Sequence, residues 1–450
     1  MSAFEDLKLN KFLHNAIDDL GFETPTPIQS EAFSVVMSGK DMVGIAQTGT
    51  GKTLAYMLPI LQSMRFSKEP NLRVLVLVPT RELVIQVVEE IEKFAKYMPQ
   101  RVVGVYGGTN INTQKKALDE GADIIVATPG RFYDLCLSRV IQLKTVRKLV
   151  IDEVDVMLDL GFRFQLTNIF ELLPERRQNI MFSATMTEDV DVLINDFFIN
   201  PKKVSVAISG TPLENITQHS YAVPNFYTKV NLLIDLLKDK EVFSKVLVFV
   251  SNKRSADRLF EELEEPYGEE SCLIHSNKTQ NYRIRSINQF DEGKNRIMVA
   301  TDVMARGLDL DKITHVINFD TPRYPENYMH RIGRTGRAEK EGRSLLFHTE
   351  FETPFKDSIE KLMDYSIPKL EIPSNIEVSK RLTPEEQPAI VEINNPHKAA
   401  VIETKGASFH EKSEKNSKEN QGGSYRAKIE KKYKKPKTRG DKNYNKRNKR

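Results

Sequence analysis

The sequence is poor in cysteine and has no long apolar stretch. Its only cysteines, Cys136 and Cys272, lie far apart in the chain. They provide neither a disulfide framework nor a zinc site, which is typical of a protein in a reducing cytoplasm. No run approaches the ~18 apolar residues that a membrane-spanning helix needs. The first six residues, Met1–Asp6, end in two acids and contain no apolar core segment, so we expect no secretory signal.

Charge is distributed unevenly along a composition that is otherwise typical of a globular protein. The chain is 40% hydrophobic and 28% charged, and its 450 residues predict two or three structural units. Residues Arg426–Arg450 contain thirteen Lys or Arg and two acids, a net charge of +11. Because the whole chain carries +4, the preceding 425 residues carry −7. Such a basic end is typical of an arm that binds polyanions.

Short apolar runs alternate with amphipathic helical stretches, such as Arg81–Lys96, through the first two hundred residues. This alternation predicts an α/β fold with a parallel sheet covered on both faces. The predicted strands of this part are Met42–Ala46, Arg73–Val78, Val102–Tyr106, Asp123–Ala127, Lys148–Asp152 and Asn179–Ser183.

The alternation stops at the turn-rich residues Ser209–Pro212 and then resumes. It predicts a second α/β domain with strands at Lys245–Val250, Leu273–His275, Arg296–Thr301, His315–Phe319 and Ser344–His348. We therefore expect domains at residues 1–208 and 217–366, joined by a linker at 209–216. Beyond them we expect a poorly structured extension at 367–404 and a disordered basic tail at 405–450.

A glycine-rich loop follows the first predicted strand and precedes a helical pattern. It spans Ala46–Thr53 and departs from the pattern G-x-x-x-x-G-K-[ST] only at Ala46. Backbone N–H groups of such a loop, together with the helix N-terminus, bind phosphate oxygens. Lys52 would reach the β- and γ-phosphates, and the Thr53 hydroxyl would hold Mg²⁺. The alternative is a glycine-rich turn without a ligand.

Two carboxylates end another predicted strand about 100 residues later. Asp152 and Glu153 follow the apolar run Leu149–Ile151. Asp152 would bind Mg²⁺ through water, and Glu153 would orient and deprotonate the attacking water. An acidic pair at this position is by itself more often a helix N-cap. Together with the Lys52 loop, it indicates a nucleotide triphosphatase.

From Phe4 to about Tyr365 the sequence resembles the DEAD-box RNA helicases. Residues Asp152–Asp155 correspond to the tetrad that names the family, with Val154 where Ala is usual. The resemblance implies two RecA-like domains in tandem, each built on a parallel sheet. It also implies RNA-dependent hydrolysis of ATP with Mg²⁺. Since both acids with assigned chemistry are present, the Val154 departure leaves the expectation of hydrolysis intact.

Residues Gly21–Gln29 resemble the family's adenine-recognition motif, and Phe4 lies seventeen residues before it, as in the family. The Gln29 amide offers a donor and an acceptor to the adenine edge, and Phe22 can stack on the ring. Read without the resemblance, the Thr-Pro-Thr-Pro run is only a rigid turn. The predicted nucleotide-binding residues are Phe22, Thr24, Gln29, Ala46, Gln47, Thr48, Gly49, Thr50, Gly51, Lys52, Thr53 and Asp309.

Several further segments resemble the family's RNA-backbone contacts. Small residues, hydroxyls and guanidinium groups at strand-to-helix turns suit phosphate oxygens and 2′-hydroxyls. Taken singly, Arg81 or Arg131 is as easily a solvated surface charge. The predicted RNA-binding residues are Pro79, Thr80, Arg81, Gly107, Gly108, Thr128, Pro129, Arg131 and Thr301. Ser183–Thr185 resembles the family's coupling motif.

The second domain carries the complementary half of the predicted site. Residues Val299–Asp309 resemble a family motif in which Thr301 contacts RNA and Asp309 contacts the ATP ribose. In the segment His330–Arg337, the resemblance makes Arg334 and Arg337 the arginine fingers on the γ-phosphate. It also makes His330 the link to the Ser183–Thr185 turn; the alternative is a basic helix without a ligand. Departures from the family pattern fall at Val156, Ser276 and Glu339, to which we assign no chemistry.

The predicted activity is ATP-dependent local unwinding of short RNA duplexes, with the predicted catalytic residues Lys52, Asp152, Glu153, His330, Arg334 and Arg337. The basic tail would add nonspecific RNA contacts, because tyrosines interleave with its cations; alternatively it only aids solubility. Competing hypotheses are an RNA clamp whose hydrolysis times release, and a DNA translocase. The chain resembles bacterial helicases of ribosome assembly and RNA turnover, whose proteins are then candidate partners, and we expect it in the cytoplasm.

Overall fold

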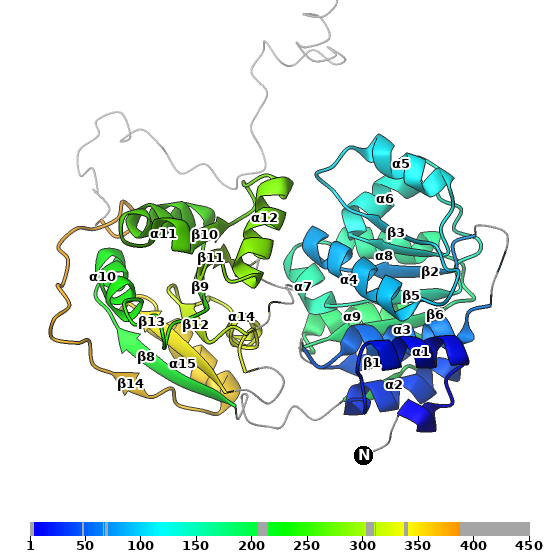
Figure 1. Ribbon diagram of the computed structural model, residues 1–450, viewed down its shortest axis with the longest axis horizontal. Helices are drawn as coiled ribbons and strands as arrows, with labels where there is room; N and C mark the ends of the chain where they lie inside the picture. Colours follow the sequence, from blue (N-terminus) through cyan, green and yellow to red (C-terminus); the bar gives the residue numbers. More distant parts are fainter. Residues whose placement is uncertain are drawn as a thin grey trace, which may run out of the picture. The chain divides into compact units, whose positions relative to one another are not determined.

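The computed structural model describes residues 4–46, 49–65, 67, 71–205, 215–302, 310, 312–336 and 341–387. All of them belong to one compact unit that ends at Gln387. The predicted basic tail and part of the predicted linker lie outside the described residues. Two parallel sheets, one after the other along the chain, organise the described part (Figure 1).

The first half of the chain forms a seven-stranded parallel sheet in the order β3-β4-β2-β5-β6-β1-β7. Its strands are β1 (Met42–Ile45), β2 (Val74–Leu77), β3 (Val102–Val105), β4 (Ile124–Ala127), β5 (Lys148–Ile151), β6 (Gln178–Ser183) and β7 (Lys202–Ser205). The predicted strands of this half are all present, each within one residue of the predicted bounds. Parallel pairing requires a crossover between strands, and helices supply it.

Helices cover both faces of this sheet. They are η1 (Phe4–Leu7), α1 (Lys11–Asp19), α2 (Pro27–Met37), α3 (Lys52–Ser63), α4 (Arg81–Phe94), α5 (Ile111–Asp119), α6 (Pro129–Leu137), α7 (Val154–Asp159), α8 (Arg163–Leu172) and α9 (Glu188–Phe197). Successive residues of β2 alternate between two cores: Val74 and Val76 pack in one, Leu75 and Leu77 in the other. Because side chains of a strand point to opposite faces, this alternation shows that neither face of the sheet is open to water.

The second half repeats the design with a sheet in the order β10-β11-β9-β12-β13-β8-β14. All of its neighbouring strands pair in parallel. The strands are β8 (Ile216–Ala222), β9 (Val246–Val250), β10 (Ser271–Ile274), β11 (Ile297–Thr301), β12 (His315–Asn318), β13 (Gly342–His348) and β14 (Lys369–Leu370). The prediction of an α/β fold with two parallel sheets is thus confirmed.

The helices of the second half are α10 (Phe226–Leu236), α11 (Lys253–Tyr267), η2 (Gly268–Glu270), α12 (Gln280–Asp291), α14 (Pro325–Ile332) and α15 (Thr353–Met363). They also cover both faces, because Val246 and Val248 of β9 pack in one core while Leu247 and Phe249 pack in another. Among the described residues, no helix is both long and apolar enough to cross a membrane.

Three strands were not predicted from the sequence, namely β7, β8 and β14. Strand β8 begins at Ile216, the last residue of the predicted linker, and its sequence is mostly polar. Its buried polar groups are bonded: the Gln218 Oε1 accepts a hydrogen bond from the Tyr328 hydroxyl at 2.9 Å. The two domain ranges drawn from the sequence stay predictions.

Residues 371–387, which we name the C-terminal strap, have little regular structure but are bonded to the second half of the chain. Arg258 pairs with Glu385 at 3.1 Å. The Phe226 backbone N–H, at the start of α10, donates to Glu386 Oε1 at 2.7 Å. The side-chain amide of Asn225 donates to the Ser379 carbonyl at 2.6 Å. The strap therefore brings the chain to the N-terminal end of α10 before it leaves the described part.

Candidate active site

The strand order of the first sheet divides its carboxyl edge into two halves. Strands β5, β6 and β1 are neighbours: Asp152 and Glu153 follow β5, Ser183 ends β6, and the glycine-rich loop follows β1. Strands β3, β4 and β2 are also neighbours, and the loops and helix starts after them carry the predicted RNA-binding residues of this domain. The carboxyl edge is where ligands bind in open α/β sheets. The predicted nucleotide and RNA residues of this domain thus gather in two adjoining sets.

The glycine-rich loop is held by the segment that resembles the adenine motif. Gln29 donates from Nε2 to the Gly51 carbonyl at 3.2 Å, and Thr26 donates from Oγ1 to the Thr50 carbonyl at 3.0 Å. Gly51 is the N-cap of α3 and has φ +80°, where a Cβ would lie 2.2 Å from Gln29 Nε2. Only glycine fits this contact and this backbone. Gln29 therefore shapes the loop, and its reading of adenine remains a prediction.

Lys52 and Asp152 face each other in the floor of this edge. Both side chains are buried, and Lys52 Nζ lies 3.5 Å from Asp152 Oδ1. Within the described part of the chain, neither atom has a hydrogen-bond partner. Burial raises the pKa of Asp152 above its usual value, and the charge of Lys52 opposes this rise. Buried, unsatisfied polar atoms of opposite charge indicate a site built for a ligand.

Glu153 adopts a backbone conformation that glutamate rarely takes. Its φ is +53°, and it is the N-cap of α7. The side chain is only 5% exposed, and its Oε2 has no hydrogen-bond partner among the described residues. A left-handed non-glycine residue costs about 1–3 kcal/mol, and such costs concentrate at functional sites. The conformation places a buried carboxylate directly beside Asp152.

Asp155 links this set to the Ser183–Thr185 turn. Its Oδ2 accepts hydrogen bonds from the Thr185 backbone N–H at 3.0 Å and the Thr185 hydroxyl at 2.9 Å. His330 Nε2 of α14 lies 3.5 Å from the same oxygen. Burial would raise the pKa of Asp155, but His330, Lys52 and Thr185 together lower it below its usual value. His330 therefore reaches the turn through Asp155, for which the sequence predicts no separate role.

Two of the predicted RNA residues of the first sheet, Arg81 and Gly108, lie against each other. The Arg81 guanidinium lies so close to Gly108 that a Cβ there would be 1.9 Å from Arg81 Nη1. Arg131 donates to the Gln114 side chain at 2.7 Å and to the Thr109 carbonyl at 3.0 Å. Arg81 and Arg131 thus both contact the loop after β3. Gln114, which also donates to the Tyr106 carbonyl at 3.0 Å, was missed because a lone Gln on a helix carries no sequence signal.

The remaining first-sheet residues of the prediction occupy helix starts or turns. Thr80 caps α4 and accepts the Leu83 N–H at 3.3 Å, while Thr128 precedes Pro129 at the start of α6. Phe22 and Thr24 are exposed in the turn before α2. Within the described residues, neither side chain forms a hydrogen bond or ion pair with the Lys52 set.

In the second sheet, Thr301 ends β11 and is buried. The next residue, Asp302, forms a bidentate pair with Arg331 at 2.5 and 2.8 Å. Arg334 is buried and donates to the His330 carbonyl at 3.3 Å. Four predicted site residues lie outside the described part, namely Gln47, Thr48, Asp309 and Arg337.

One further contact set was not expected from the sequence. Glu82, next to Arg81, accepts a hydrogen bond from Gln280 Nε2 at 2.8 Å and pairs with Arg283 at 2.5 Å. Gln280 and Arg283 lie one helical turn apart on α12, so both reach the same carboxylate. In the sequence, the only sign that Gln280 and Arg283 act together was their spacing of three residues, which places both on one face of a helix.

Two family models match the chain. Residues 26–193 match the DEAD/DEAH box helicase family, and residues 228–339 match the helicase conserved C-terminal domain. These ranges include the Lys52 set and the His330 segment, respectively.

Named relatives and solved structures give the same result. The DEAD-box ATP-dependent RNA helicase CshA of Bacillus anthracis is 39% identical over 88% of this chain and 75% of its own length. The ATP-dependent RNA helicase DeaD of Buchnera aphidicola is 38% identical over 84% and 62%, respectively. The structure of S. cerevisiae Dbp5 bound to RNA and ADP BeF3 matches with a TM-score of 0.75 at 26% identity, over 83% of this chain and 96% of that one. Mss116p bound to ssRNA and AMP-PNP matches with a TM-score of 0.75 at 28% identity, over 82% and 78%. On its sequence, fold and relatives, the chain belongs to the DEAD/DEAH box helicase family.

Proposed function

We propose that this protein hydrolyses ATP in an RNA-dependent manner and uses the cycle to unwind short RNA duplexes locally. One observation carries the proposal: a single sheet edge holds two adjoining sets of residues. One set centres on the buried, unsatisfied pair Lys52 and Asp152, and the other on Arg81 and Arg131. The first suits a nucleotide triphosphate and the second suits a sugar-phosphate backbone.

In the nucleotide set, Lys52 binds the β- and γ-phosphates, and Glu153 takes the proton of the attacking water. The buried carboxylate of Asp152 and the hydroxyl of Thr53, the residue after Lys52, fit Mg²⁺, because Asp152 Oδ1 has no hydrogen-bond partner in the described chain. When bound, Mg²⁺ would neutralise charge on the phosphates. Arg334 and Arg337 would contact the γ-phosphate from the second domain as arginine fingers.

In the RNA set, backbone turns and guanidinium groups bind phosphates, and Thr301 of the second sheet adds a hydroxyl. Dbp5 and Mss116p, which share this fold, have been solved with RNA bound. If RNA and ATP both favour the same arrangement of the two domains, each raises the affinity for the other. Hydrolysis then removes the γ-phosphate contacts and releases the strand.

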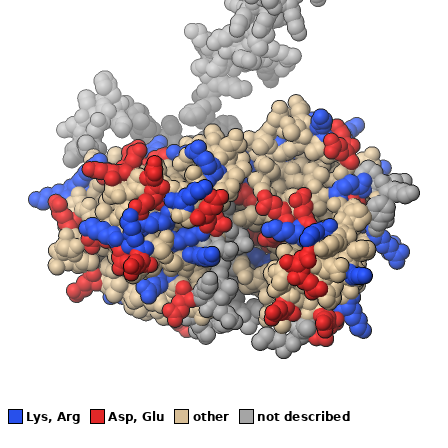
Figure 2. Space-filling model, viewed as in Figure 1, with Lys and Arg blue, Asp and Glu red and all other residues tan. Residues whose placement is uncertain are grey.

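The basic tail supplies an additional, nonspecific RNA contact in this proposal. On the face shown in Figure 2, Lys and Arg side chains are interspersed with Asp and Glu. The dense positive charge of this chain is instead in Arg426–Arg450, with a net +11. The tail contribution to RNA affinity should therefore fall steeply with salt. We place the protein in the cytoplasm, on its cysteine usage, with ribosome-assembly or RNA-turnover proteins as candidate partners.

The deciding experiment is steady-state ATP hydrolysis without nucleic acid, with single-stranded RNA and with single-stranded DNA. Glu153→Gln is the inactive reference, and Glu171→Gln, at an exposed acid of α8, is the matched control. We expect RNA to stimulate hydrolysis, DNA not to, and Glu153→Gln to hold ATP and RNA together. Equal stimulation by DNA, or none by either, would remove RNA helicase from the proposal.

A strand-displacement assay with a short RNA duplex separates unwinding from clamping. Displacement that needs ATP supports the helicase. RNA-stimulated hydrolysis without displacement supports a clamp whose hydrolysis only times release.

A further inference from the structure

An open cavity of about 930 Å³ lies at the carboxyl edge of the second sheet. Its walls include Ser251 after β9, Asp320 after β12 and Thr349 after β13, and the C-terminal strap closes one side. Asp302 also lines it. Asp302 directly follows Thr301, so the cavity begins one residue after the predicted RNA contact.

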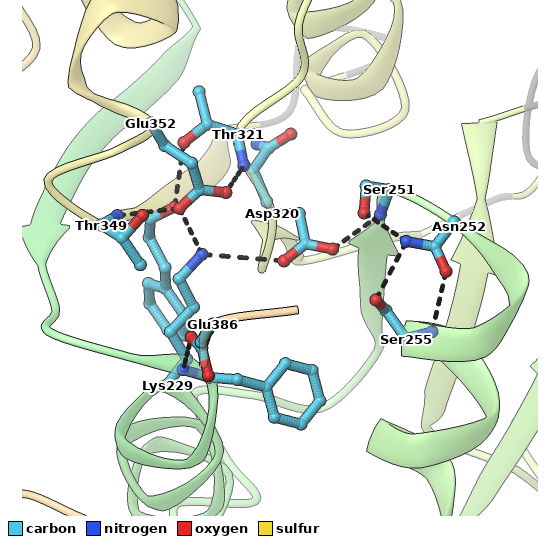
Figure 3. A network of polar contacts seen from close by, with 12 residues as sticks. Lys229, Ser251, Asn252, Ser255, Asp320, Thr321, Thr349, Glu352 and Glu386 are labelled. Carbon is cyan, nitrogen blue, oxygen red and sulfur yellow. Dashed lines mark hydrogen bonds and ion pairs between the residues drawn. The ribbon is translucent and has the colours of Figure 1, made fainter. Parts of the chain in front are cut away.

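The inner wall of the cavity is polar but its charges are paired (Figure 3). Lys229 is 2% exposed, and its Nζ lies 2.6 Å from Glu352 and 3.7 Å from Asp320. Glu352 also accepts the backbone N–H groups of Thr321 and Thr349 at 3.0 and 2.8 Å. Since these carboxylates surround a single buried ammonium, this wall does not attract phosphate.

The same network fixes the loops at the cavity floor. Asp320 accepts the Ser251 backbone N–H at 2.8 Å, and its own carbonyl accepts a hydrogen bond from Arg331 at 2.7 Å. Asn252, the N-cap of α11, donates to the Ser251 and Ser255 hydroxyls, each at 3.1 Å. Three loops of this edge are therefore held in place (Figure 3), and the cavity is largely preformed.

The mouth of the cavity is aromatic. Tyr324 is 63% exposed and Phe351 is 78% exposed. Phe355, which also lines the cavity, packs edge-on against Phe351 with ring centroids 6.0 Å apart. Water contacts two large apolar rings here, so a flat apolar ligand that covers them gains free energy. Arg323, next to Tyr324 on the same loop, is exposed as well.

We propose that this cavity binds an unpaired nucleobase of the RNA that flanks the strand held at Thr301. The base stacks on Tyr324 and Phe351, since every nucleobase has a π-face that aromatic rings accept. Wall carboxylates such as Glu350 accept N–H groups of a base and repel phosphate, whereas Arg323 suits the phosphate at the rim. The backbone would then run outside and the base would point in. This inference rests on the proposed function, because the flank reaches the cavity only if the adjoining edge binds RNA.

The test compares three RNAs: a short strand that fills only the core site, the same strand extended by a few nucleotides at either end, and the extended strand with abasic sites in the extension. We expect the intact extension at one end to raise affinity, and the abasic extension to lose that gain. Tyr324→Ala and Phe351→Ala should remove the gain, by on the order of 5- to 100-fold, the range of one stacked base. Tyr324→Phe should keep it.

Phe164→Ala is the matched control, because Phe164 is 66% exposed on α8 of the first sheet. If the short strand neither binds nor stimulates hydrolysis, the proposed function itself fails. If the short strand works but the alanine variants bind the extended strand like wild type, the cavity is not a nucleobase site, and a partner protein becomes its candidate occupant. An abasic extension that binds as tightly as the intact one would also overturn the proposal, since only phosphates would then be held.

Discussion

The Asp155 carboxylate accepts two hydrogen bonds from Thr185, one from its backbone amide at 3.0 Å and one from its hydroxyl at 2.9 Å. This contact joins the start of α7, which follows the predicted catalytic acids, to the turn after β6. His330 Nε2 lies 3.5 Å from the same carboxylate oxygen. One buried acid thus connects the predicted hydrolytic residues with the segment of the predicted arginine fingers.

Asp155→Asn should uncouple RNA binding from hydrolysis. The amide keeps the size of the side chain but loses the charge that faces His330, and it turns an N–H₂ group toward donors. A hydrogen bond to a charged group contributes about 1.5–3 kcal/mol, so we expect RNA-stimulated turnover to fall roughly 10- to 100-fold. The measurement is the kcat of ATP hydrolysis at saturating RNA. Asp191→Asn, at an exposed acid of α9, is the control, and an undiminished kcat would refute the link.

Gly51→Ala should impair ATP binding for two separable reasons, a strained backbone and a clash with Gln29. The residue has φ +80°, and the new Cβ would lie 2.2 Å from Gln29 Nε2. Gly161 has φ +79° with nothing within 4 Å, so Gly161→Ala carries the backbone cost alone. That cost is about 1–2 kcal/mol of folding stability. We expect Gly161→Ala to bind a fluorescent ATP analogue like wild type and Gly51→Ala to bind it at least about tenfold more weakly. Equal affinities would show that Gln29 does not shape the loop.

Gly108→Ala should weaken RNA binding through Arg81. The substituted Cβ would lie 1.9 Å from Arg81 Nη1, so the guanidinium group must move. An arginine that contacts phosphate contributes both affinity and salt dependence. We expect RNA affinity to fall about 5- to 10-fold and the slope of its logarithm against the logarithm of salt concentration to become shallower. Gly161→Ala again provides the baseline; an unchanged slope would mean that Arg81 does not contact phosphate.

The strands that could be predicted from the sequence are those whose buried side chains are apolar. Strands such as β2, with the sequence Val-Leu-Val-Leu, can be recognised in the sequence. Both faces of a parallel sheet are covered, so every residue of such a strand is apolar. Strand β8 was not recognised, because its buried positions include Gln218 and Ser220, which bond Tyr328 and the Ile367 carbonyl instead of packing as hydrocarbons. Strand β7 was missed because Val204 is its only buried residue.

The candidate site could be predicted where a short run of residues is itself typical of phosphate or metal binding, as in Gly51-Lys52-Thr53 and Asp152-Glu153. It was not predictable where a residue acts through another one. Asp155 looks like an ordinary acid in the first turn of a helix, and its role appears only when Thr185 is brought to it by the pairing of β5 with β6. Long-range contacts of this kind depend on topology, which local patterns do not contain.

Lys229→Met should strongly destabilise the second half of the chain. The buried ammonium lies 2.6 Å from Glu352, and its removal leaves that carboxylate and Asp320 without their cation. Breaking a buried pair costs about 3–5 kcal/mol, because the partner charge stays buried. Glu352→Gln in the same chain should recover part of this loss, since the amide oxygen still accepts a backbone N–H. The measurement is chemical denaturation of both variants and of Glu352→Gln alone. Strictly additive effects would contradict the coupling.

His315 should make stability fall between pH 6.5 and pH 4. Burial, assisted by the charge of Arg343, lowers the pKa of His315 from 6.5 to about 4. The imidazole ring packs against the ring of Phe243, with the two ring centroids 4.2 Å apart. The unfolded chain takes up a proton near pH 6.5 while the folded chain does not, so the stabilisation is complete above pH 6.5 and is lost as the pH falls toward 4. The resulting loss in the free energy of unfolding amounts to at most about 3.4 kcal/mol.

The free energy of unfolding of the wild type and of His315→Gln, measured at pH 7.5 and pH 5, checks this prediction. We expect the variant to lose most of the difference between the two pH values. A smaller dependence should remain, because burial also lowers the pKa of His348. His14→Gln, at a half-exposed histidine of α1, should behave like wild type. If His315→Gln kept the full dependence, another group would have to bind the proton on unfolding, and His315 would be protonated as readily in the folded chain as in the unfolded one.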